Sequence, residues 1–480
     1  MEEKMEQQLG QRLNEHHAVS DKQLKIALER QRLHGGRLGH NLAALGYITS
    51  AEFDSISKRT PVAPKAVQDT GLELSFIADL IMKHILHMGE FKLSDLEDSI
   101  KLPASVLDPA VELLRREKLI EVKGAAEYVK SSYNFSINEN GKARASELLD
   151  ICQYSGPAPV PLESYRKMVE LQTINNMEIN EERVRKAFSE LIVGEKLLRR
   201  LGPAISSGNP IFMYGPPGNG KTTLAERIGD ILPSTIFMPY SIIVGGQIII
   251  IFDPVNHTPV PDVSKPAGNG QAADQRWVRV RRPVVTTGGE LTLKTLDLEF
   301  NTIAKYYEAP LQMKANNGLF IIDDFGRQQV DPQQLLNRWI VNLDRKIDFM
   351  SLHTGMKFEI PFDQLVIFST NLEPKTLVDE AFLRRIRYKI KIDHPTEEEY
   401  EHIFRKVCES NDVPFRKEVF EYLLSNYYKR LGVPLNACHP RDIIGHVVDD
   451  SRYYNYPPEL TEETIQNAWE NYFVGDSEGE

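Results

Sequence analysis

The chain has 480 residues, of which 26% are charged, and its formal net charge is −11. A domain typically has ~100–200 residues, so this length predicts roughly three domains. The acidic balance excludes a general attraction to nucleic acid or to an anionic membrane, although it does not exclude a local basic patch.

The cysteines and the termini indicate where the protein resides. Cys152, Cys408 and Cys438 lie far apart, and none belongs to a C-x-x-C pair. This spacing argues against a disulfide framework or a metal cluster and indicates a reducing compartment. The N-terminal residues lack the basic-then-apolar order of a signal peptide. The most apolar run, residues 242–252, is interrupted by Gly245 and Gly246 and is too short to span a bilayer. We therefore expect a cytoplasmic protein without membrane insertion.

Residues 1–58 contain an internal repeat, in which Leu9 recurs as Leu38 and Leu13 as Leu42. Such a repeat is first a packing device and predicts a small helical module.

The second copy of this repeat, from Arg37 to Gly46, reads R-L-G-H-N-L-A-A-L-G. It resembles MshEN, the N-terminal module of type II secretion and type IV pilus ATPases, some of which bind cyclic-di-GMP through paired R-L-G-x-x-L-x-x-x-G motifs. The resemblance implies a cyclic-di-GMP site at residues 37–46. The first copy, however, has Gln8 in place of the arginine. Because a glutamine cannot pair with phosphate as an arginine does, a docking module without a ligand is the alternative.

After a linker at residues 59–71, residues 72–150 predict a winged-helix-like domain. Apolar periodicity predicts three helices, a hairpin and a fourth helix. Their expected bounds are residues 76–87, 93–100, 104–114, 120–122 with 133–137, and 141–149. The third helix carries Asp108 and Glu112 in its middle, and Arg115 and Arg116 only at its end. Carboxylates facing phosphates weaken binding, so a protein-contact or dimer module is favoured over DNA binding.

A second linker, residues 151–163, leads to a G-x-x-x-x-G-K-T motif that ends at Thr222. The motif follows an apolar run at residues 211–214 and precedes a helix-forming stretch, which is the context a P-loop requires. Glycines let backbone N–H groups wrap a polyphosphate, and the helix directs its positive end to the same phosphates. Lys221 is expected to reach the β- and γ-phosphates of ATP, and Thr222 to ligate Mg²⁺. The candidate nucleotide contacts of this loop are Gly215, Pro216, Pro217, Gly218, Asn219, Gly220, Lys221, Thr222 and Thr223.

An insertion follows the P-loop helix. Residues 236–244 form an apolar segment, residues 254–270 predict a loop, and residues 276–283 alternate charged and apolar positions. We expect residues 276–283 to pair, across a turn at 286–290, with a returning strand at 291–298. Four arginines on the first strand, with Trp277 among them, have two open interpretations. They grip a nucleic-acid backbone, or they form a solvated face or meet the carboxylates of a neighbouring subunit.

Two further apolar runs end in polar residues. Residues 319–322 precede Asp323 and Asp324, and residues 365–368 lead to Asn371. Strands buried on both faces have this pattern, and parallel sheets place ligands at the carboxyl ends of their strands. Asp323 is expected to hold Mg²⁺, and Asp324 to orient or deprotonate the attacking water.

In this order, the motifs resemble those of AAA+ ATPases, with residues 319–324 as Walker B and residues 365–371 as sensor 1. A hairpin expected at residues 347–358 resembles that of the MoxR and RuvB-like clade. The resemblance implies that Asn371 lies near the γ-phosphate and that Val193 and Gly194 contact the base. Most AAA+ proteins have glutamate where this chain has Asp324. Initiator-type members carry the Asp-Asp pair, so hydrolysis is not excluded, and a binding-only switch stays an alternative.

The same resemblance implies three arginine roles. Residues 379–386 resemble an arginine-finger segment, in which Arg385, or else Arg384, completes the site of a neighbouring subunit. The alternative is a basic helix end that answers its own dipole. Residues 394–473 read as a helical lid, with helices expected at 397–407, 417–429, 441–453 and 462–473. Arg441, at the start of the third of these, matches sensor 2.

The sequence therefore predicts a multidomain α/β protein. Its expected parts are an MshEN-like module at residues 1–58, a winged-helix-like domain at 72–150, an AAA+ core with αβα layers at 164–393 and a lid at 394–473. The expected function is hydrolysis of ATP with Mg²⁺ by a ring oligomer, with a hexamer favoured, that remodels a protein substrate or acts through an adaptor. The alternatives are a nucleic-acid motor or loader, and an ATP-gated scaffold with little turnover.

Overall fold

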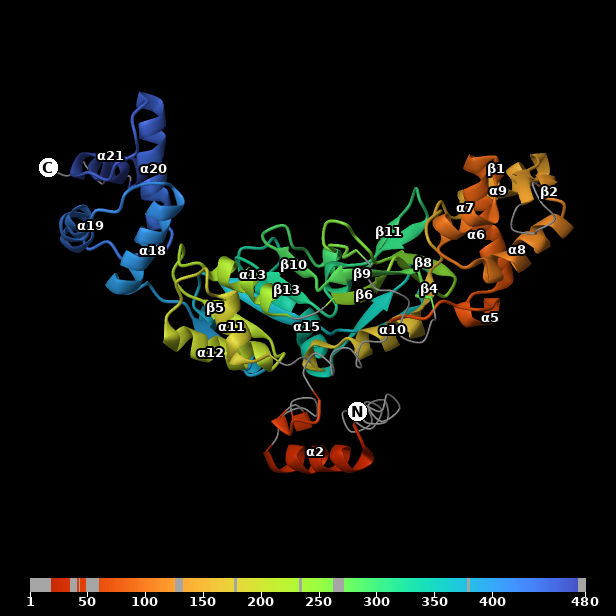
Figure 1. The fold of residues 1–480 in the computed structure, drawn as a ribbon, viewed down its shortest axis with the longest axis horizontal. Coiled ribbons are helices and arrows are strands. Elements are labelled where there is room, and N and C mark those ends of the chain that lie inside the picture. The colour runs from red at the N-terminus through yellow and green to blue at the C-terminus, as the bar shows by residue number, and fades with distance from the viewer. Residues whose placement is uncertain are drawn as a thin grey trace.

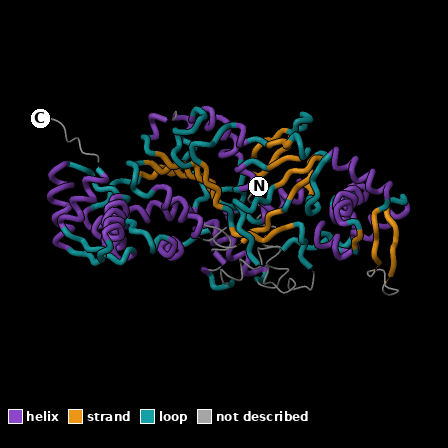
Figure 2. Tube along the Cα trace, turned by 90° about the horizontal axis from the view of Figure 1, so that it is seen from above, coloured by secondary structure: helices purple, strands orange, loops and turns teal. Residues whose placement is uncertain are grey.

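The computed structural model describes residues 19–34, 41–42, 44–48, 60–125, 133–176, 179–232, 235–261, 272–377 and 380–473. A central α/β core lies between a helical lid at one end of the long axis and a domain of helices and a small sheet at the other (Figure 1). In the view from above, the lid contains helices and loops, whereas the core mixes strands and helices (Figure 2).

The core is built on a five-stranded parallel sheet with the order β10-β13-β16-β5-β17. The strands are β5 Ile211–Tyr214, β10 Val284–Thr287, β13 Leu319–Ile322, β16 Leu365–Thr370 and β17 Tyr388–Lys391. Every residue of β13 and of β16 is buried, as expected for a strand covered on both faces. The two Asp- and Asn-terminated runs of the sequence are therefore neighbouring central strands.

Helices cover both faces of this sheet. On one face, Ile211 and Met213 pack with α13, α11 and α12, and on the other, Phe212 and Phe368 pack with Trp339 of α15. The bounds are α11 Glu181–Ala187, α12 Glu195–Ser206, α13 Lys221–Ile231 and α15 Pro332–Arg345. The alternation of neighbouring residues between the two faces gives the three αβα layers.

A second five-stranded sheet, with the order β11-β12-β8-β7-β4, extends the core toward the domain at residues 72–150 (Figure 1). Its strands are β4 Val160–Pro161, β7 Ser241–Val244, β8 Gln247–Ile250, β11 Glu299–Asn301 and β12 Tyr306–Glu308. Helix α10, Leu162–Leu171, packs against this sheet. The expected hairpin at residues 347–358 is present, as β14 Ile347–Ser351 paired with β15 Lys357–Pro361.

The prediction of a returning strand at residues 291–298 is wrong. Strand β9, Trp277–Arg281, pairs instead with β6, Thr235–Pro239. Part of the expected turn belongs to β10, which joins the core sheet, and Lys294–Leu296 forms a 3₁₀ turn. Leu291 and Leu296 are buried against the core, so their alternation with polar residues reflects the packing of a turn.

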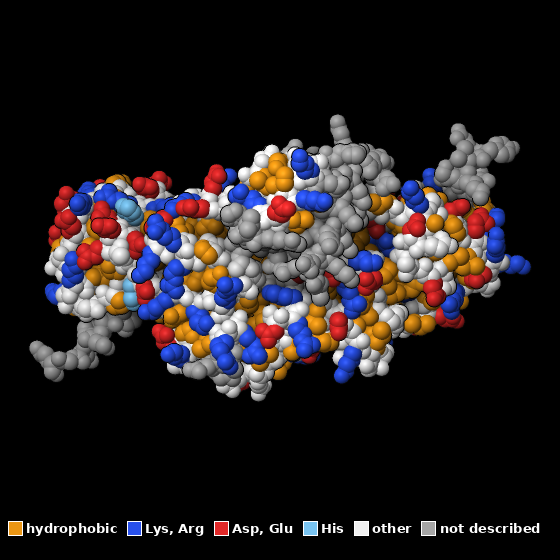
Figure 3. Space-filling view, turned by 90° about the horizontal axis from the view of Figure 1, so that it is seen from below, with side chains coloured by type: hydrophobic (Ala, Val, Ile, Leu, Met, Phe, Trp, Pro, Cys, Tyr) orange, Lys and Arg blue, Asp and Glu red, His pale blue; other side chains and the backbone are white. Residues whose placement is uncertain are grey.

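The four arginines of β9 and its flanks do not form one solvated face, which each of the two open interpretations required. Arg276 is buried and paired with Asp274. Arg279 donates to Thr235 Oγ1, and Arg282 donates to the Asn317 carbonyl. Lys and Arg side chains gather elsewhere, over the underside of the core, while Asp and Glu are numerous at the lid end (Figure 3).

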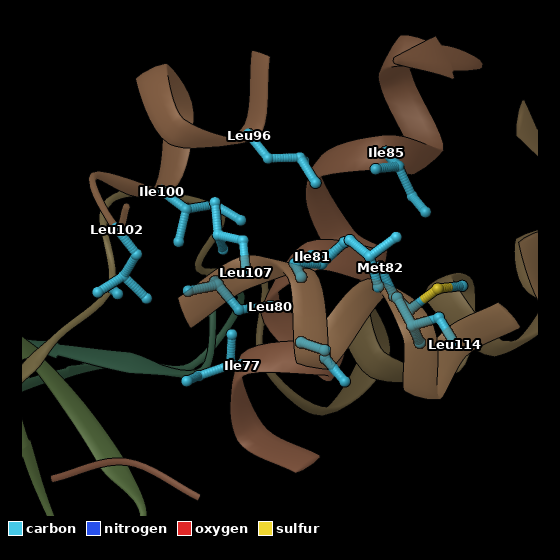
Figure 4. Packing of buried hydrophobic residues seen from close by; sticks show 14 of the residues in the cluster. Ile77, Leu80, Ile81, Met82, Ile85, Leu96, Ile100, Leu102, Leu107 and Leu114 are labelled. Atoms are coloured by element: carbon cyan, nitrogen blue, oxygen red, sulfur yellow. The ribbon is translucent and has the colours of Figure 1, made fainter. Parts of the chain in front are cut away.

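Residues 72–150 contain the helices and the hairpin that the sequence predicts. The helices are α6 Leu74–Met88, α7 Leu93–Ile100, α8 Ala104–Arg116 and α9 Glu139–Ile151. Strands β1 Glu90–Phe91, β2 Ile120–Ala125 and β3 Tyr133–Ile137 form an antiparallel sheet with the order β1-β3-β2. Ile81, Leu96 and Leu107 meet in a single apolar core (Figure 4). Burial of this shared surface holds the first three helices together.

The segment expected as a stiff linker, residues 151–163, is packed between this domain and the second sheet. Tyr154 and Ala158 belong to the apolar core of the domain, together with Ile248 of β8. The Tyr154 hydroxyl lies 2.8 Å from Ser241 Oγ and donates to the Pro157 carbonyl at 2.7 Å. The segment therefore forms a contact between the two parts.

The lid contains α18 Glu397–Ser410, α19 Lys417–Leu423, α20 His439–Tyr454 and α21 Glu462–Tyr472. The helix expected at residues 417–429 changes at Leu424 to a π-helical segment, Leu424–Lys429. Thr396 and Glu399 form a capping box that starts α18. Among the described residues, no helix has the length and apolarity needed to cross a bilayer.

At the N-terminus, α2, Asp21–His34, contributes to a small cluster of Val19, Ala27, Leu42 and Ile48. The first copy of the repeat up to residue 18, and Arg37 with residues 35–40 of the second, lie outside the described residues.

Candidate functional site

The phosphate loop, residues 215–220, connects β5 to α13 as the motif predicts. Gly215, Gly218 and Gly220 have φ values of +141°, +76° and +75°. Only glycine adopts such backbone conformations without strain. A Cβ on Gly215 would lie 2.1 Å from the Ile392 carbonyl oxygen at the end of β17. The phosphate loop therefore packs directly against the backbone at Ile392, where the chain leaves the sheet toward the lid.

We expect Gly215→Ala to abolish binding of a fluorescent ATP analogue, because the added methyl group displaces the loop from Ile392. Gly246→Ala is the matched control. Gly246 has a φ of +78° in the β7–β8 turn, and nothing lies within 4 Å of a Cβ there. Both variants place an alanine at a positive φ, which is strained, but only the first carries the clash. Equal binding by the two variants would contradict this account.

Lys221 is buried at the first turn of α13. Its Nζ donates to the carbonyl oxygens of Gly215 and Pro216 at 3.0 and 2.8 Å. Burial lowers the pKa of Lys221, whereas Asp323 and Asp324 act in the opposite direction. The ammonium group therefore lies at the loop, close to two carboxylates.

Four side chains from three segments meet at the carboxyl edge of the sheet. Thr222 Oγ1 donates to Asp323 Oδ2 at 2.7 Å, and Asn371 Nδ2 donates to Asp324 Oδ1 at 3.0 Å. Strands β5, β13 and β16 are neighbours, so the residues after them reach the same place. A hydroxyl and a carboxylate in contact are ligands of the hard kind that Mg²⁺ takes, beside substrate phosphates. The donor set therefore fits Mg²⁺.

Sequence reasoning missed Gln328, which shapes this edge and belongs to no motif. Its Nε2 donates to the carbonyl oxygens of Asp323 and Asp324, at 2.9 and 3.2 Å. Asp324 has a φ of +47°, a left-handed conformation that aspartate tolerates better than most residues. Gln328 thus stabilises the turn that presents the Asp324 carboxylate.

A cavity of about 430 Å³ adjoins the phosphate loop, between the core and the lid. Its lining includes Val193, Gly194 and Thr223, which the sequence assigned to nucleotide contacts. Apolar side chains of Leu224 and Ile403 form part of its wall. Charged side chains, among them Lys196, Asp393 and Glu399, also line the cavity, so it offers both apolar and polar contacts to a ligand.

The lid touches the phosphate loop directly through the segment before α20. The Cys438 N–H donates to the Gly218 carbonyl at 2.8 Å, and the Ala437 N–H donates to Asn219 Oδ1 at 3.1 Å. Asn219 Nδ2 in turn donates to Asn436 Oδ1 at 3.3 Å. Sequence reasoning missed Asn436 and Cys438, because a loop before a helix carries no motif.

The three candidate arginines do not lie on the phosphate loop of their own chain. Arg385 pairs with Asp344 of α15 at 2.9 Å, and Arg384 is exposed beside it. Arg441 is 78% exposed and pairs with Asp442 at 3.1 Å. Their predicted roles near the γ-phosphate stay predictions.

A family model described as magnesium chelatase, subunit ChlI, matches residues 188–239, and one described as a domain of unknown function (DUF8689) matches residues 396–471. No curated protein matches the chain.

Solved structures with similarity to the chain include three from bacteria. A RuvB mutant from Thermotoga maritima has 15% identity over 64% of this chain and 74% of its own, with a TM-score of 0.34. Domain III of the Thermotoga maritima replication initiation protein DnaA has 15% identity over 62% and 100%, with a TM-score of 0.34. NtrX from Brucella abortus in complex with ADP has 14% identity over 75% and 64%, with a TM-score of 0.36.

The sheet order, with β5 between β16 and β17, and the phosphate loop after β5 give the core the αβα fold of a P-loop nucleotide-binding domain.

Proposed function

We propose that the chain binds ATP with Mg²⁺ at the phosphate loop and hydrolyses it, as a ring oligomer that remodels a protein partner. The observation that supports this proposal best is the pair of contacts at one sheet edge, Thr222 with Asp323 and Asp324 with Asn371. A P-loop alone only binds nucleotide. Hydrolysis also needs a metal-holding acid and a group that activates water, and the candidates for these roles, Asp323 and Asp324, lie beside the loop.

Each residue of this edge has a defined role in the proposal. Lys221 and the loop N–H groups bind the β- and γ-phosphates. Thr222 and Asp323 hold Mg²⁺, which neutralises charge on the phosphate oxygens when bound. Asp324 accepts a proton from the attacking water, and Asn371 orients the Asp324 carboxylate. Val193 and Gly194 contact the base in the adjoining cavity.

The ring is supported by the place of Arg385, which pairs with Asp344 at the surface of its own chain. In the proposal it exchanges this exposed partner for the developing charge at a neighbouring subunit's γ-phosphate, with Arg384 beside it. An exposed ion pair contributes ~0.2–1 kcal/mol, so the exchange costs little. We favour a hexamer.

Complementation between two inactive variants tests the ring. We expect the wild-type rate per protomer to rise with concentration and then to saturate, as oligomers form. Arg385→Ala is expected to lower kcat by about 10³-fold, the low end of the effect of an arginine finger. Lys221→Ala is expected to bind no nucleotide. A mixture of the two variants should regain activity, because one supplies an intact loop and the other an intact arginine.

The control for this test is Arg387→Ala, since Arg387 is exposed nearby and lies over the Tyr388 ring. It should behave as wild type. Full activity in a monomer, or no gain on mixing, would contradict the ring.

The N-terminal parts are proposed to select the target. The order of helices and hairpin in residues 72–150 supports a winged-helix-like domain, and Asp108 and Glu112 on α8 favour a protein over DNA as its partner. We also propose that residues 1–58 form an MshEN-like module, that this module binds cyclic-di-GMP at Arg37–Gly46, and that the protein is cytoplasmic.

A further inference from the structure

A continuous chain of hydrogen bonds runs from the phosphate loop into the core of the lid. Asn219 Nδ2 donates to Asn436 Oδ1 at 3.3 Å, and Asn436 Nδ2 lies 3.2 Å from His439 Nε2. His439 Nδ1 lies 3.0 Å from the Tyr428 hydroxyl, which lies 2.6 Å from the Tyr400 hydroxyl. Asn219, His439, Tyr428 and Tyr400 are all buried. The chain therefore joins the nucleotide site to the lid interior through Asn436.

The directions of these hydrogen bonds follow from the chemistry of the amide. Asn436 Nδ2 can only donate, so His439 Nε2 accepts and the imidazole carries its proton on Nδ1. That proton is then donated to Tyr428. The imidazole must be neutral, and burial lowers the pKa of His439 to about 4, although Asp442 opposes the shift. His439 is accordingly neutral at physiological pH.

A second histidine fixes the other end of the amide. His394 stands at the boundary between core and lid, and its Nδ1 lies 2.9 Å from the Leu435 carbonyl and 2.8 Å from Asn436 Oδ1. Both partners are acceptors, so His394 Nδ1 donates. Asn436 Oδ1 thus accepts from His394 and Asn219, while Nδ2 donates to His439. The asparagine amide offers the acceptor and the donor on two separate atoms, which a single hydroxyl does not.

We propose that Asn436 is a positioning residue that ties the orientation of the phosphate loop to the position of the lid. The inference rests on the proposed function, because it assigns a role to the same nucleotide site. Gly218 and Asn219, which hold the N–H groups of Cys438 and Ala437, belong to the loop that wraps phosphates. Phosphate binding that reorients these two residues shifts the acceptors of the lid segment. The lid then follows the occupancy of the site, because the two states differ in their contacts.

Hydrogen exchange without nucleotide tests the tie by itself. In full-length Asn436→Ala, amides in peptides spanning residues 435–442 should exchange about tenfold faster than in wild type, because the loop loses its side-chain anchors. Asn411→Ala is the matched control, since Asn411 caps the end of α18 through the Val407 carbonyl, away from the loop. It should leave this segment unchanged. Wild-type exchange in Asn436→Ala would overturn the proposal.

Asn436→Asp gives a pH signature that a merely structural role lacks. Its carboxylate still accepts from Asn219 and His394 but cannot donate to His439 Nε2. The new carboxylate raises the pKa of His439, which then takes up a proton and donates to it. Other groups at His439 are Asp442 on α20, Tyr428, Tyr472 of α21, Cys438 and His394. Exchange in this variant should be fast at pH 9 and approach the wild-type rate near pH 6, and a pH-independent difference from wild type would overturn the account.

Energy transfer between dyes at exposed positions of α12 and α19 tests the tie during binding. Addition of a fluorescent, non-hydrolysable ATP analogue should change the transfer in wild type and in Asn411→Ala, and at most half as much in Asn436→Ala. Analogue binding with an equal change in all three proteins would overturn the inference but leave the proposed function intact. Failure of wild type to bind the analogue would overturn the proposed function, while the exchange experiment would still report the tie.

Discussion

Replacement of Asp324 with asparagine is expected to lower ATP turnover by about 10²–10⁴-fold, the usual effect of removing a general base. In the native chain, Asn371 Nδ2 donates to Asp324 Oδ1 at 3.0 Å. The substituted amide keeps a carbonyl oxygen for this contact but cannot take a proton from water. Nucleotide binding should persist, because Lys221 and Thr222 are untouched. The measurement is phosphate release under saturating ATP, with affinity determined separately.

The matched control is Asp230→Asn. Asp230 lies on α13, the helix that follows the phosphate loop, and pairs with Arg227 on the surface. Its turnover should equal that of wild type. Turnover by Asp324→Asn at the wild-type rate would remove Asp324 from the mechanism. Asp324→Glu separates the remaining alternative. If wild type turns over slowly and the glutamate variant faster, the chain is an ATP-gated scaffold whose aspartate is one methylene too short.

Some of the fold was predictable, because it depends on patterns that are local in sequence. Fully apolar runs predicted the two central strands that end at Asp323 and Asn371, since only a strand buried on both faces needs such a run. The glycine spacing after β5 predicted the phosphate loop, because its conformation requires φ > 0 at fixed positions. The contact between Thr222 and Asp323 could also be expected, because parallel strands place the residues that follow them at one edge of the sheet.

Other features depend on contacts between distant segments and left no local pattern. The alternation in residues 276–283 correctly predicted a strand but not its partner β6, which lies some forty residues earlier in the chain. Arg276 looked like a surface charge. The segments that bury it together with Asp274 are far away in the sequence, and they include Thr70 and Pro159, whose carbonyl oxygens accept from its guanidinium. Asn436 showed no signal at all, because its role depends on Asn219, more than two hundred residues away. Pairing and burial of polar groups thus had to come from the structure.

Arg276 is the second residue whose loss should have a large effect, here on stability. Its guanidinium and Asp274 are 6% and 4% exposed, and Nη2 lies 2.9 Å from Asp274 Oδ2. Nη1 also donates to the carbonyl oxygens of Thr70 and Pro159, at 3.1 and 3.4 Å. Through this one side chain, the residue directly before β9 contacts both segments that flank the domain at residues 72–150.

Arg276→Ala is expected to lower the free energy of unfolding by ~3–5 kcal/mol, because it removes the guanidinium that pairs with the buried Asp274 carboxylate and leaves only the backbone N–H of residue 276 as its donor. Arg281→Ala, at an exposed position of β9, the strand that begins directly after Arg276, should stay within about 0.5 kcal/mol of wild type. Denaturant titration followed through intrinsic tryptophan fluorescence measures both variants. The double variant Arg276→Met with Asp274→Leu should recover most of the loss, since an apolar pair of similar volume removes the unpaired charge. Because it cannot bind the carbonyls of Thr70 and Pro159, it should still expose residues 60–71 to protease faster than wild type does. A stability of Arg276→Ala close to that of Arg281→Ala would show that the buried pair does not hold this junction.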